Sequence, residues 1–272
     1  MSTSRGEQMT RSAVVTGCGQ GIGRAILERL RDDGYFVVGI ERLEDLAGDA
    51  RDALGSGGAV VQGDVADKAV AEEAADVARA SAELGAWVNN AAIMPATNLH
   101  APVVEDVRRV FDGNLMGCYW GCSTAVRAFL AQRSPGAIVS ISSVHGRVAY
   151  SNAVAYDISK AGIDALTRYV ATEYGPVGIR ANAIAPGGVR TPLFEKWVAE
   201  ADDPGRVERE AAYSHPLRRV AEPREIAAVA SFLLSEESSF VSGQSLAVDG
   251  GLTARCIDFE LDPTIRAFFD QA

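Results

Sequence analysis

The chain has 272 residues, of which 47% are hydrophobic, and its formal net charge is −10. Length and composition are typical of a folded domain with a large core and exclude general disorder. The acidic balance argues against nucleic acid or an anionic membrane as a partner, and no apolar run approaches the ~20 residues that span a bilayer.

Residues 1–10 are polar and lack the apolar core of a signal peptide, so we expect a loose leader and a cytoplasmic protein. The four cysteines, Cys18, Cys118, Cys122 and Cys256, do not suggest a disulfide framework in a chain of this kind. Cys118 and Cys122 lie one helical turn apart, but no His or acidic residue has fitting spacing nearby. We therefore expect buried thiols rather than a metal site.

The first predicted elements are a strand at residues 12–15, a glycine-rich loop, Thr16-Gly-Cys-Gly-Gln-Gly-Ile-Gly23, and an amphipathic helix at 22–31. Glycines let backbone amides approach a pyrophosphate, and a helix N-terminus adds partial positive charge. Strand, loop and helix together favour a dinucleotide site over a simple tight turn. The expected contacts are Gly17, Gly19, Gln20, Gly21, Ile22 and Gly23.

The second predicted strand, residues 36–40, ends at Glu41 and Arg42. A carboxylate there can accept hydrogen bonds from both ribose hydroxyls of NAD and repel a 2′-phosphate. The Arg42 guanidinium could instead bind that phosphate. Because Gln20 adds no second cation, the balance favours NAD over NADP.

The middle of the chain continues the alternation of strands and helices. We expect a third strand at residues 59–62, a helix at 66–83 and a fourth strand at 87–89. A long segment at 103–133 contains Asn114 and has apolar positions that require one buried face, against the sheet or another subunit.

The stretch from 140 to 160 holds a hydroxyl, a phenol and an ammonium group, on Ser143, Tyr156 and Lys160. A helix predicted over 155–174 stacks Tyr156 and Lys160 on one face, one turn apart. A fixed cation stabilises a phenolate, and lowering a phenol pKa from about 10 to near 7 takes roughly 4 kcal/mol. Ser143 follows a predicted strand at 137–141 and can donate to an oxygen that develops negative charge. Tyr-x-x-x-Lys is common by chance, so a surface pair remains the alternative for this pattern alone.

The last part predicts a strand at residues 180–185, a helix at 223–234 and a strand at 245–248. Between them, the charged segment 193–216 breaks at Asp202-Asp-Pro-Gly205 and is expected to be a mobile lid. The alternation predicts an α/β fold: a single-domain, Rossmann-like, doubly wound parallel sheet of about seven strands with helices on both faces. The domain is expected over residues 11–252. The apolar tail, 253–272, is expected to dock on it or on a neighbouring subunit.

Taken in order, these motifs resemble the short-chain dehydrogenase/reductase family, in the type with a Thr-Gly-x-x-x-Gly-x-Gly loop and a Tyr-x-x-x-Lys pair. The resemblance extends over residues 11–252. It rests on the glycine loop, Asp64, Asn89-Asn90-Ala91, Asn114, Ser143, Tyr156, Lys160 and Pro186-Gly187.

The resemblance implies a catalytic set. Tyr156 would be the acid/base that removes the alcohol proton as hydride passes to a nicotinamide, and Ser143 would hold the substrate oxygen. Lys160 would bind the nicotinamide ribose and lower the Tyr156 pKa, while Asn114 would hold a water in the proton relay. Asp64 and Val65 would meet adenine, Asn90 the adenosine side, and Val189 and Thr191 the carboxamide. The other implied cofactor contacts are Glu41, Arg42, Ala91, Ala92, Tyr156, Lys160, Pro186 and Gly187.

Two departures from the family pattern stand out. Position 92 is alanine where the family usually has glycine, which adds one methyl beside the cofactor. The connection at residues 83–87 is shorter than usual, so the strand register around Trp87 is open. Candidate substrate contacts besides Ser143, each of which could equally pack within a loop, are His145, Tyr150, Asn152, Phe194, Trp197 and Met94.

The leading hypothesis is an NAD-dependent oxidoreductase that interconverts a secondary alcohol and its ketone, in the oxidative direction, on a small cyclic alcohol, a sugar or a steroid- or terpenoid-like compound. One alternative is an NADPH-dependent 3-oxoacyl-thioester reductase, with Arg42 binding the phosphate. The other is a catalytically silent dinucleotide-sensing protein. Because the family usually forms tetramers, we expect a homotetramer or a homodimer.

Overall fold

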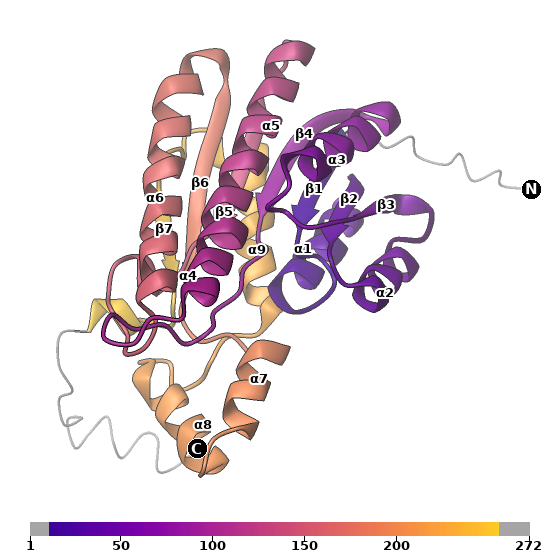
Figure 1. Ribbon diagram of the computed structural model, residues 1–272. Coiled ribbons are helices and arrows are strands. Elements are labelled where there is room, and N and C mark those ends of the chain that lie inside the picture. The colour runs from indigo at the N-terminus through magenta and orange to yellow at the C-terminus, as the bar shows by residue number, and fades with distance from the viewer. Residues whose placement is uncertain (1–10, 256–272) are drawn as a thin grey trace, which may run out of the picture.

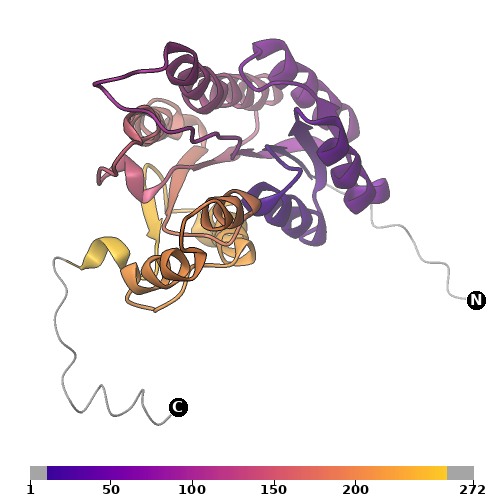
Figure 2. The ribbon, with the colours of Figure 1, turned by 60° about the horizontal axis from the view of Figure 1, so that its bottom comes forward.

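The computed structural model describes residues 11–255, which form one seven-stranded parallel sheet between two layers of helices (Figures 1 and 2). The strand order is β3-β2-β1-β4-β5-β6-β7, and every neighbouring pair is parallel. This confirms the predicted Rossmann-like α/β fold. The predicted leader and most of the predicted tail, with Cys256, lie outside the described residues.

The strands are β1 (Arg11–Thr16), β2 (Phe36–Glu41), β3 (Gly58–Gln62), β4 (Glu83–Asn89), β5 (Gly136–Ile141), β6 (Ile179–Pro186) and β7 (Ser245–Val248). The helices are α1 (Gly21–Asp32), α2 (Glu44–Leu54), α3 (Lys68–Ser81), α4 (Val104–Val110), α5 (Gly117–Gln132), α6 (Val154–Tyr174), α7 (Pro192–Ala199), α8 (Pro204–Ser214) and α9 (Pro223–Leu234).

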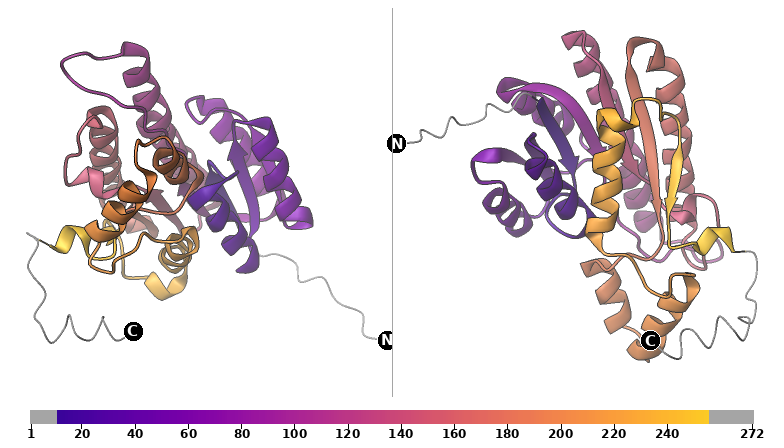
Figure 3. Two further views of the ribbon diagram at one scale, coloured as in Figure 1. Left: turned by 90° about the horizontal axis from the view of Figure 1, so that it is seen from below. Right: turned by 180° about the vertical axis from the view of Figure 1, so that it is seen from behind.

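Two apolar cores lie on opposite faces of the sheet. In β1, Ala13 and Val15 pack with α1, α2 and α9, whereas Val14 packs with α3, α5 and α6 on the other face. Side chains alternate between the faces of a strand, and both faces of this sheet are covered, so its strands are apolar throughout. Figure 3 shows α9 lying across the sheet on the face opposite α5 and α6.

The fourth strand differs from the prediction. The expected helix at 66–83 ends at Ser81, and the strand begins at Glu83 rather than Trp87. The residues taken for a short connection are therefore strand residues: Leu84 and Ala86 are fully buried, and the segment pairs with β1. The pairing register of β4 with β1 shifts between Ser12 and Ala13, which pair with Leu84 and Ala86. Helix α2, which the sequence analysis left unassigned, packs beside β2 and β3.

The long segment at 103–133 is two helices joined by a π-helical turn, Phe111–Met116, which contains Asn114. A π turn holds one more residue than an α turn and occurs frequently at functional sites. Beyond it, α5 packs closely on β4. A Cβ at Gly121 would lie 2.0 Å from Asn89 Oδ1 and 2.7 Å from Trp87 Nε1, two atoms that are themselves hydrogen bonded.

This contact predicts that Gly121→Ala destabilises the fold, since the added methyl must separate α5 from β4. Overpacking of this kind costs roughly 1–3 kcal/mol of unfolding free energy. Gly48→Ala in α2 is the matched control, because a Cβ there meets nothing within 4 Å. The control should gain about 0.5–1 kcal/mol from helix propensity. Urea denaturation of both variants measures the difference, and equal stabilities would contradict the packing argument.

Candidate active site

The predicted cofactor residues lie in loops that follow the carboxyl ends of β1, β2, β3, β4 and β6. Figure 1 shows these ends along one edge of the sheet, with α7 and α8 beyond it. In open α/β sheets, ligands bind outside this edge. The structure therefore gathers the candidate set of residues at the expected place.

The glycine loop is held to β4 by hydrogen bonds that involve the backbone. Thr16 Oγ1 accepts from the Asn90 and Ala91 N–H groups, and Asn90 Nδ2 donates to the carbonyls of Thr16 and Gly17. The side chain of Asn90, which is predicted to lie on the adenosine side of the site, thus holds the loop. A Cβ at Gly23 would lie 2.0 Å from the Gly17 carbonyl oxygen, so α1 can approach the loop only with glycine there.

The same loop has features that a dinucleotide requires. Gly17 and Gly21 have φ angles of 62° and 57°, in the left-handed region that glycine adopts readily. Helix α1 has no acidic residue in its first turn, and Gln20 makes no side-chain cap, so its N-terminal N–H groups can face an anion. The residues present thus fit the pyrophosphate of a dinucleotide.

Glu41, at the end of β2, is almost fully buried. Its Oε2 accepts from the Gly19 N–H at 3.0 Å, and Oε1 accepts from the N–H groups of Arg42 and Leu43. These bonds fix the carboxylate beside the glycine loop, where the sequence places the adenosine ribose. The Arg42 side chain is about half exposed, and its guanidinium lies 3.9 Å from the Asp64 carboxylate.

The segment after β6 lies directly against the glycine loop. A Cβ at Gly21 would come within 3.2 Å of the Thr191 methyl group. Thr191 Oγ1 also accepts from the Phe194 N–H and so caps α7. The predicted pyrophosphate and carboxamide contacts, Gly21 and Thr191, are thereby brought next to each other.

The catalytic candidates lie at the end of β5 and on α6. Lys160 is buried, and its Nζ donates to the Ile141 carbonyl at 2.7 Å and lies 5.3 Å from the centroid of the Tyr156 ring. Ser143 Oγ accepts from the His145 N–H, which leaves the hydroxyl proton of Ser143 available to donate. A phenol, a hydroxyl and an ammonium group therefore come together, as the sequence predicted.

The pKa of Tyr156 differs from the prediction. Burial raises the pKa of the phenol to about 12, a hydrogen bond with Ser143 lowers it in part, and the Asp157 carboxylate raises it further. Burial also lowers the pKa of Lys160 to about 8. In the protein alone, burial of the phenol therefore outweighs any effect of the Lys160 ammonium group on the Tyr156 pKa.

Asn114 is buried in the π turn and binds the chain that follows β4. Its Oδ1 accepts from the Ile93 N–H at 2.8 Å, and its Nδ2 donates to the Ile93 carbonyl at 2.9 Å and to Ser159 Oγ at 3.4 Å. The side-chain amide is therefore engaged by protein groups. It fixes the position of residue 93 rather than reaching toward Lys160.

His145 belongs to a cluster at the mouth of the site. Its Nδ1 lies 2.6 Å from Asp157 Oδ1, its ring stacks on Tyr150 with centroids 4.0 Å apart, and it meets the Tyr156 ring edge-on at 5.1 Å. His145 Nε2 makes no hydrogen bond to the described residues. Asp157 was not among the residues predicted from the sequence, although a carboxylate directly after Tyr156 was a signal that pointed to it.

The other substrate candidates are less closely grouped. Asn152 has a φ of 56°, and its carbonyl accepts from the Thr97 N–H, so its position reflects a tight turn. Phe194 and Trp197 pack together on α7, 5.8 Å between ring centroids, and Trp197 is more than half exposed. The predicted lid, 193–216, consists of α7 and α8, with the predicted break between them.

Val65 packs against Gly117 of α5, and Ala92 is exposed. Cys18, Cys118 and Cys122 are buried free thiols. Within residues 11–255, no group of three or more His, Cys, Asp or Glu side chains could hold a metal ion. No helix in this part of the chain is both long and apolar enough to cross a membrane.

A family model described as "Enoyl-(Acyl carrier protein) reductase" matches residues 17–253. The chain belongs to the short-chain dehydrogenase/reductase family. As a member, it is an oxidoreductase of the kind that binds a nicotinamide dinucleotide.

Three similar proteins illustrate the range of the family. A 3beta-hydroxysteroid dehydrogenase 1 from Eggerthella lenta is 36% identical over 250 residues, 89% of this chain and 94% of that protein. A cis-4-hydroxycyclohexanecarboxylate dehydrogenase from Sinomonas cyclohexanicum is 41% identical over 251 residues, 90% and 97% of the two chains. A crystal structure of an actinorhodin polyketide ketoreductase with NADPH has a TM-score of 0.85 at 25% identity and covers 91% of this chain and 99% of its own.

The buried ammonium group of Lys160 yields a prediction about stability. The unfolded chain keeps this proton up to a pH near 10.5 and the folded chain only up to about 8, so stability rises with pH between these values. Lys160→Met should remove the cost of burying the charged group, about 3 kcal/mol of unfolding free energy at neutral pH. Loss of the hydrogen bond to Ile141 should offset about 1 kcal/mol of that gain. The variant should melt higher than the wild type, and the gap should close above about pH 8.

Lys68→Met is the control, since Lys68 is exposed and only pairs with Glu72 along α3. Its stability should change by less than about 0.5 kcal/mol. A Lys160→Met variant that melts below the wild type at pH 7 would show that the ammonium group stabilises the fold instead.

Proposed function

We propose that the protein is an NAD-dependent dehydrogenase that oxidises a secondary alcohol to a ketone, with Tyr156 as the base. The observation that carries this proposal is the arrangement of Tyr156, Ser143 and Lys160 at the edge of the sheet where the loops fit a dinucleotide. The bound nicotinamide would supply the hydride acceptor. The remaining chemistry falls to side chains of this chain.

Ser143 is hydrogen bonded with Tyr156 in the protein alone. It would donate its hydroxyl proton to the substrate oxygen and so hold that oxygen next to the Tyr156 phenol. Tyr156 would take the alcohol proton as a phenolate, the form in which it is a base. A phenol pKa of about 12 leaves this form scarce at neutral pH, so the site needs added positive charge. Lys160, together with the positive ring of the oxidised cofactor, would provide it, and Glu41 would bind the adenosine ribose.

Removing the phenolic oxygen tests this function. Tyr156→Phe should reduce alcohol turnover by at least about 10³-fold, because proton transfer loses its acceptor while the groove stays intact. The dissociation constant of NADH, measured by fluorescence, should change by less than about threefold. Tyr150→Phe serves as the control, because it removes a phenolic oxygen from the same cluster without touching the proposed base. Turnover of Tyr156→Phe near the wild-type rate would refute the role of Tyr156.

The preference for NAD is supported by Glu41. Its carboxylate is fixed by three backbone N–H groups, so it cannot move away from a 2′-phosphate without losing them. The Arg42 guanidinium faces Asp64, which offsets its charge. The second candidate, an NADPH-dependent 3-oxoacyl-thioester reductase, would need Arg42 to leave Asp64 for the phosphate. The exposure of Arg42 and the NADPH in the actinorhodin ketoreductase structure are the observations in its favour.

Two variants test whether the protein prefers NAD or NADP. Wild-type kcat/KM should favour NAD over NADP by about 100-fold, and Glu41→Gln should narrow that ratio by about tenfold, because it removes the charge and keeps an acceptor for the Gly19 N–H. Arg42→Gln should lower turnover with NADP and leave turnover with NAD unchanged. A wild-type preference for NADP would favour the reductase.

For the substrate, we propose a small cyclic or steroid-like alcohol. Two relatives are by name dehydrogenases of a hydroxysteroid and of a hydroxycyclohexane carboxylate. The stacked rings of His145 and Tyr150 and the aromatic pair on α7 offer flat apolar surfaces for a ring. His145 Nε2 offers one hydrogen-bonding atom for a second polar group on the substrate.

A further inference from the structure

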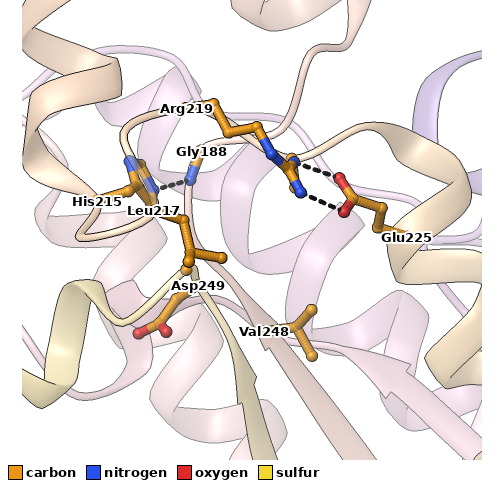
Figure 4. Close-up of a pocket in the computed structure, with 9 residues that line it drawn as sticks. Gly188, His215, Leu217, Arg219, Glu225, Val248 and Asp249 are labelled. Carbon is orange, nitrogen blue, oxygen red and sulfur yellow. Dashed lines mark hydrogen bonds and ion pairs between the residues drawn. The ribbon is translucent and has the colours of Figure 1, made fainter. Parts of the chain in front are cut away.

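We propose that His215 is a positioning residue for the reaction: as a neutral imidazole it ties helix α8 to the loop at 186–191, and protonation releases that loop and weakens cofactor binding. The proposal rests on the proposed function only in placing this loop beside the nicotinamide. His215 lies directly after α8 and is 4% exposed. Figure 4 shows its ring beside Gly188, on the wall of a cavity of about 100 Å³.

The hydrogen bonds of His215 specify one protonation state. Its Nε2 lies 2.9 Å from the Gly188 backbone nitrogen, and its Nδ1 lies 2.7 Å from the Ala211 carbonyl oxygen. A backbone N–H can only donate and a carbonyl can only accept. Nε2 must therefore carry a lone pair and Nδ1 a hydrogen, which is the neutral Nδ1–H tautomer.

The loop lies so close to the imidazole that only glycine fits. A Cβ at Gly187 would lie 2.6 Å from His215 Nε2, and one at Gly188 would lie 2.9 Å from Val220 Cγ1 and 3.1 Å from His215 Cε1. Neither glycine has a positive φ. The two glycines of this loop therefore serve close approach to the ring rather than an unusual backbone conformation.

The chain after His215 holds the other side of the same loop. The Gly188 carbonyl accepts from the Ala221 N–H at 2.8 Å, and the Arg190 N–H donates to the Ala221 carbonyl at 2.8 Å. The segment 215–221 thus forms hydrogen bonds with the N–H and the carbonyl of Gly188 and with the N–H of Arg190. Thr191 then follows, capping α7 next to Gly21. Through these contacts, His215 sets the position of the residues placed at the carboxamide.

Protonation of His215 would put an N–H group at Nε2, facing the N–H of Gly188. The hydrogen bond would be lost, and two donors would oppose each other in a buried place. Among residues 11–255, no carboxylate is hydrogen bonded to Nε2 to stabilise the added charge. Asp249 accepts from Gly251 and Thr253 and points away in Figure 4.

The remaining charged groups around the cavity are likewise engaged. Glu225 and Arg219 form a two-bonded ion pair on its far wall. On the α8 side, Arg255 donates to the Ser214 carbonyl. Among the described residues, no charged group is therefore placed to stabilise the protonated imidazole once its hydrogen bond to Gly188 is lost.

Cofactor binding measured across pH tests the proposal without any substrate. The dissociation constant of NADH is measured by fluorescence from about pH 8 to about pH 5, the range in which imidazole groups titrate. The wild type should lose about tenfold in affinity toward the acid end, the equivalent of one hydrogen bond. His215→Gln should bind with little dependence on pH, because its amide oxygen can accept from Gly188 and is not protonated. His215→Asn is too short to reach Gly188 and should bind more weakly at every pH.

His100→Gln is the matched control, since His100 is an exposed loop residue. It should keep the wild-type pH profile. A His215→Gln variant that also keeps that profile, or a His215→Asn variant that binds like the wild type, would overturn the proposal.

A second measurement needs no substitution. The chain has three histidines, so long-range ¹H–¹⁵N spectra of histidine-labelled protein can identify the tautomer of each. His215 should be the Nδ1–H form at pH 8, and an Nε2–H form would overturn the proposal. If the wild type bound no NADH at any pH, the proposed function would fail, while this spectrum would still decide the state of His215.

Discussion

The buried hydrogen bond from Lys160 to the Ile141 carbonyl is the constraint on which the site depends. It joins α6 to the carboxyl end of β5, and so it sets where Tyr156 and Ser143 meet. An ammonium group is costly to bury, and this one has a single acceptor among residues 11–255, so the fold keeps a charge that it does not need for stability. The charge is placed where a phenolate must form, which is the usual conflict between stability and activity at an active site.

Several polar side chains around the candidate site form hydrogen bonds with the backbone of loops. Asn90 and Thr16 hold the glycine loop, Asn114 holds residue 93, and Glu41 holds Gly19. The same task falls to His215 at the opposite wall. Since these residues satisfy backbone groups that would otherwise lie unpaired, the loops have defined positions before any ligand arrives.

The sequence predicted the sheet and most of the site, because the apolar strands and the glycine, serine, tyrosine and lysine motifs are local patterns. Prediction from the sequence failed where a contact between distant residues determines the local structure. Leu84 was predicted to lie in a short connection, but it pairs with β1 as a strand residue, and α2 carries a weak pattern of small residues. The orientation of Lys160 toward Ile141 and the partners of His215 join residues 19 and 27 positions apart, which no motif encodes.

The π turn before α5 also governs how this chain tolerates changes in length. Each residue turns an α-helix by about 100°, so deleting one residue from Phe111–Met116 would rotate α5 relative to α4 by that angle. Gly121 would then leave Trp87 and Asn89, or Asn114 would leave Ile93. The contacts of α4 and α5 thus fix the number of residues between the two helices. After a deletion, only an insertion within the same stretch would restore the orientation of α5.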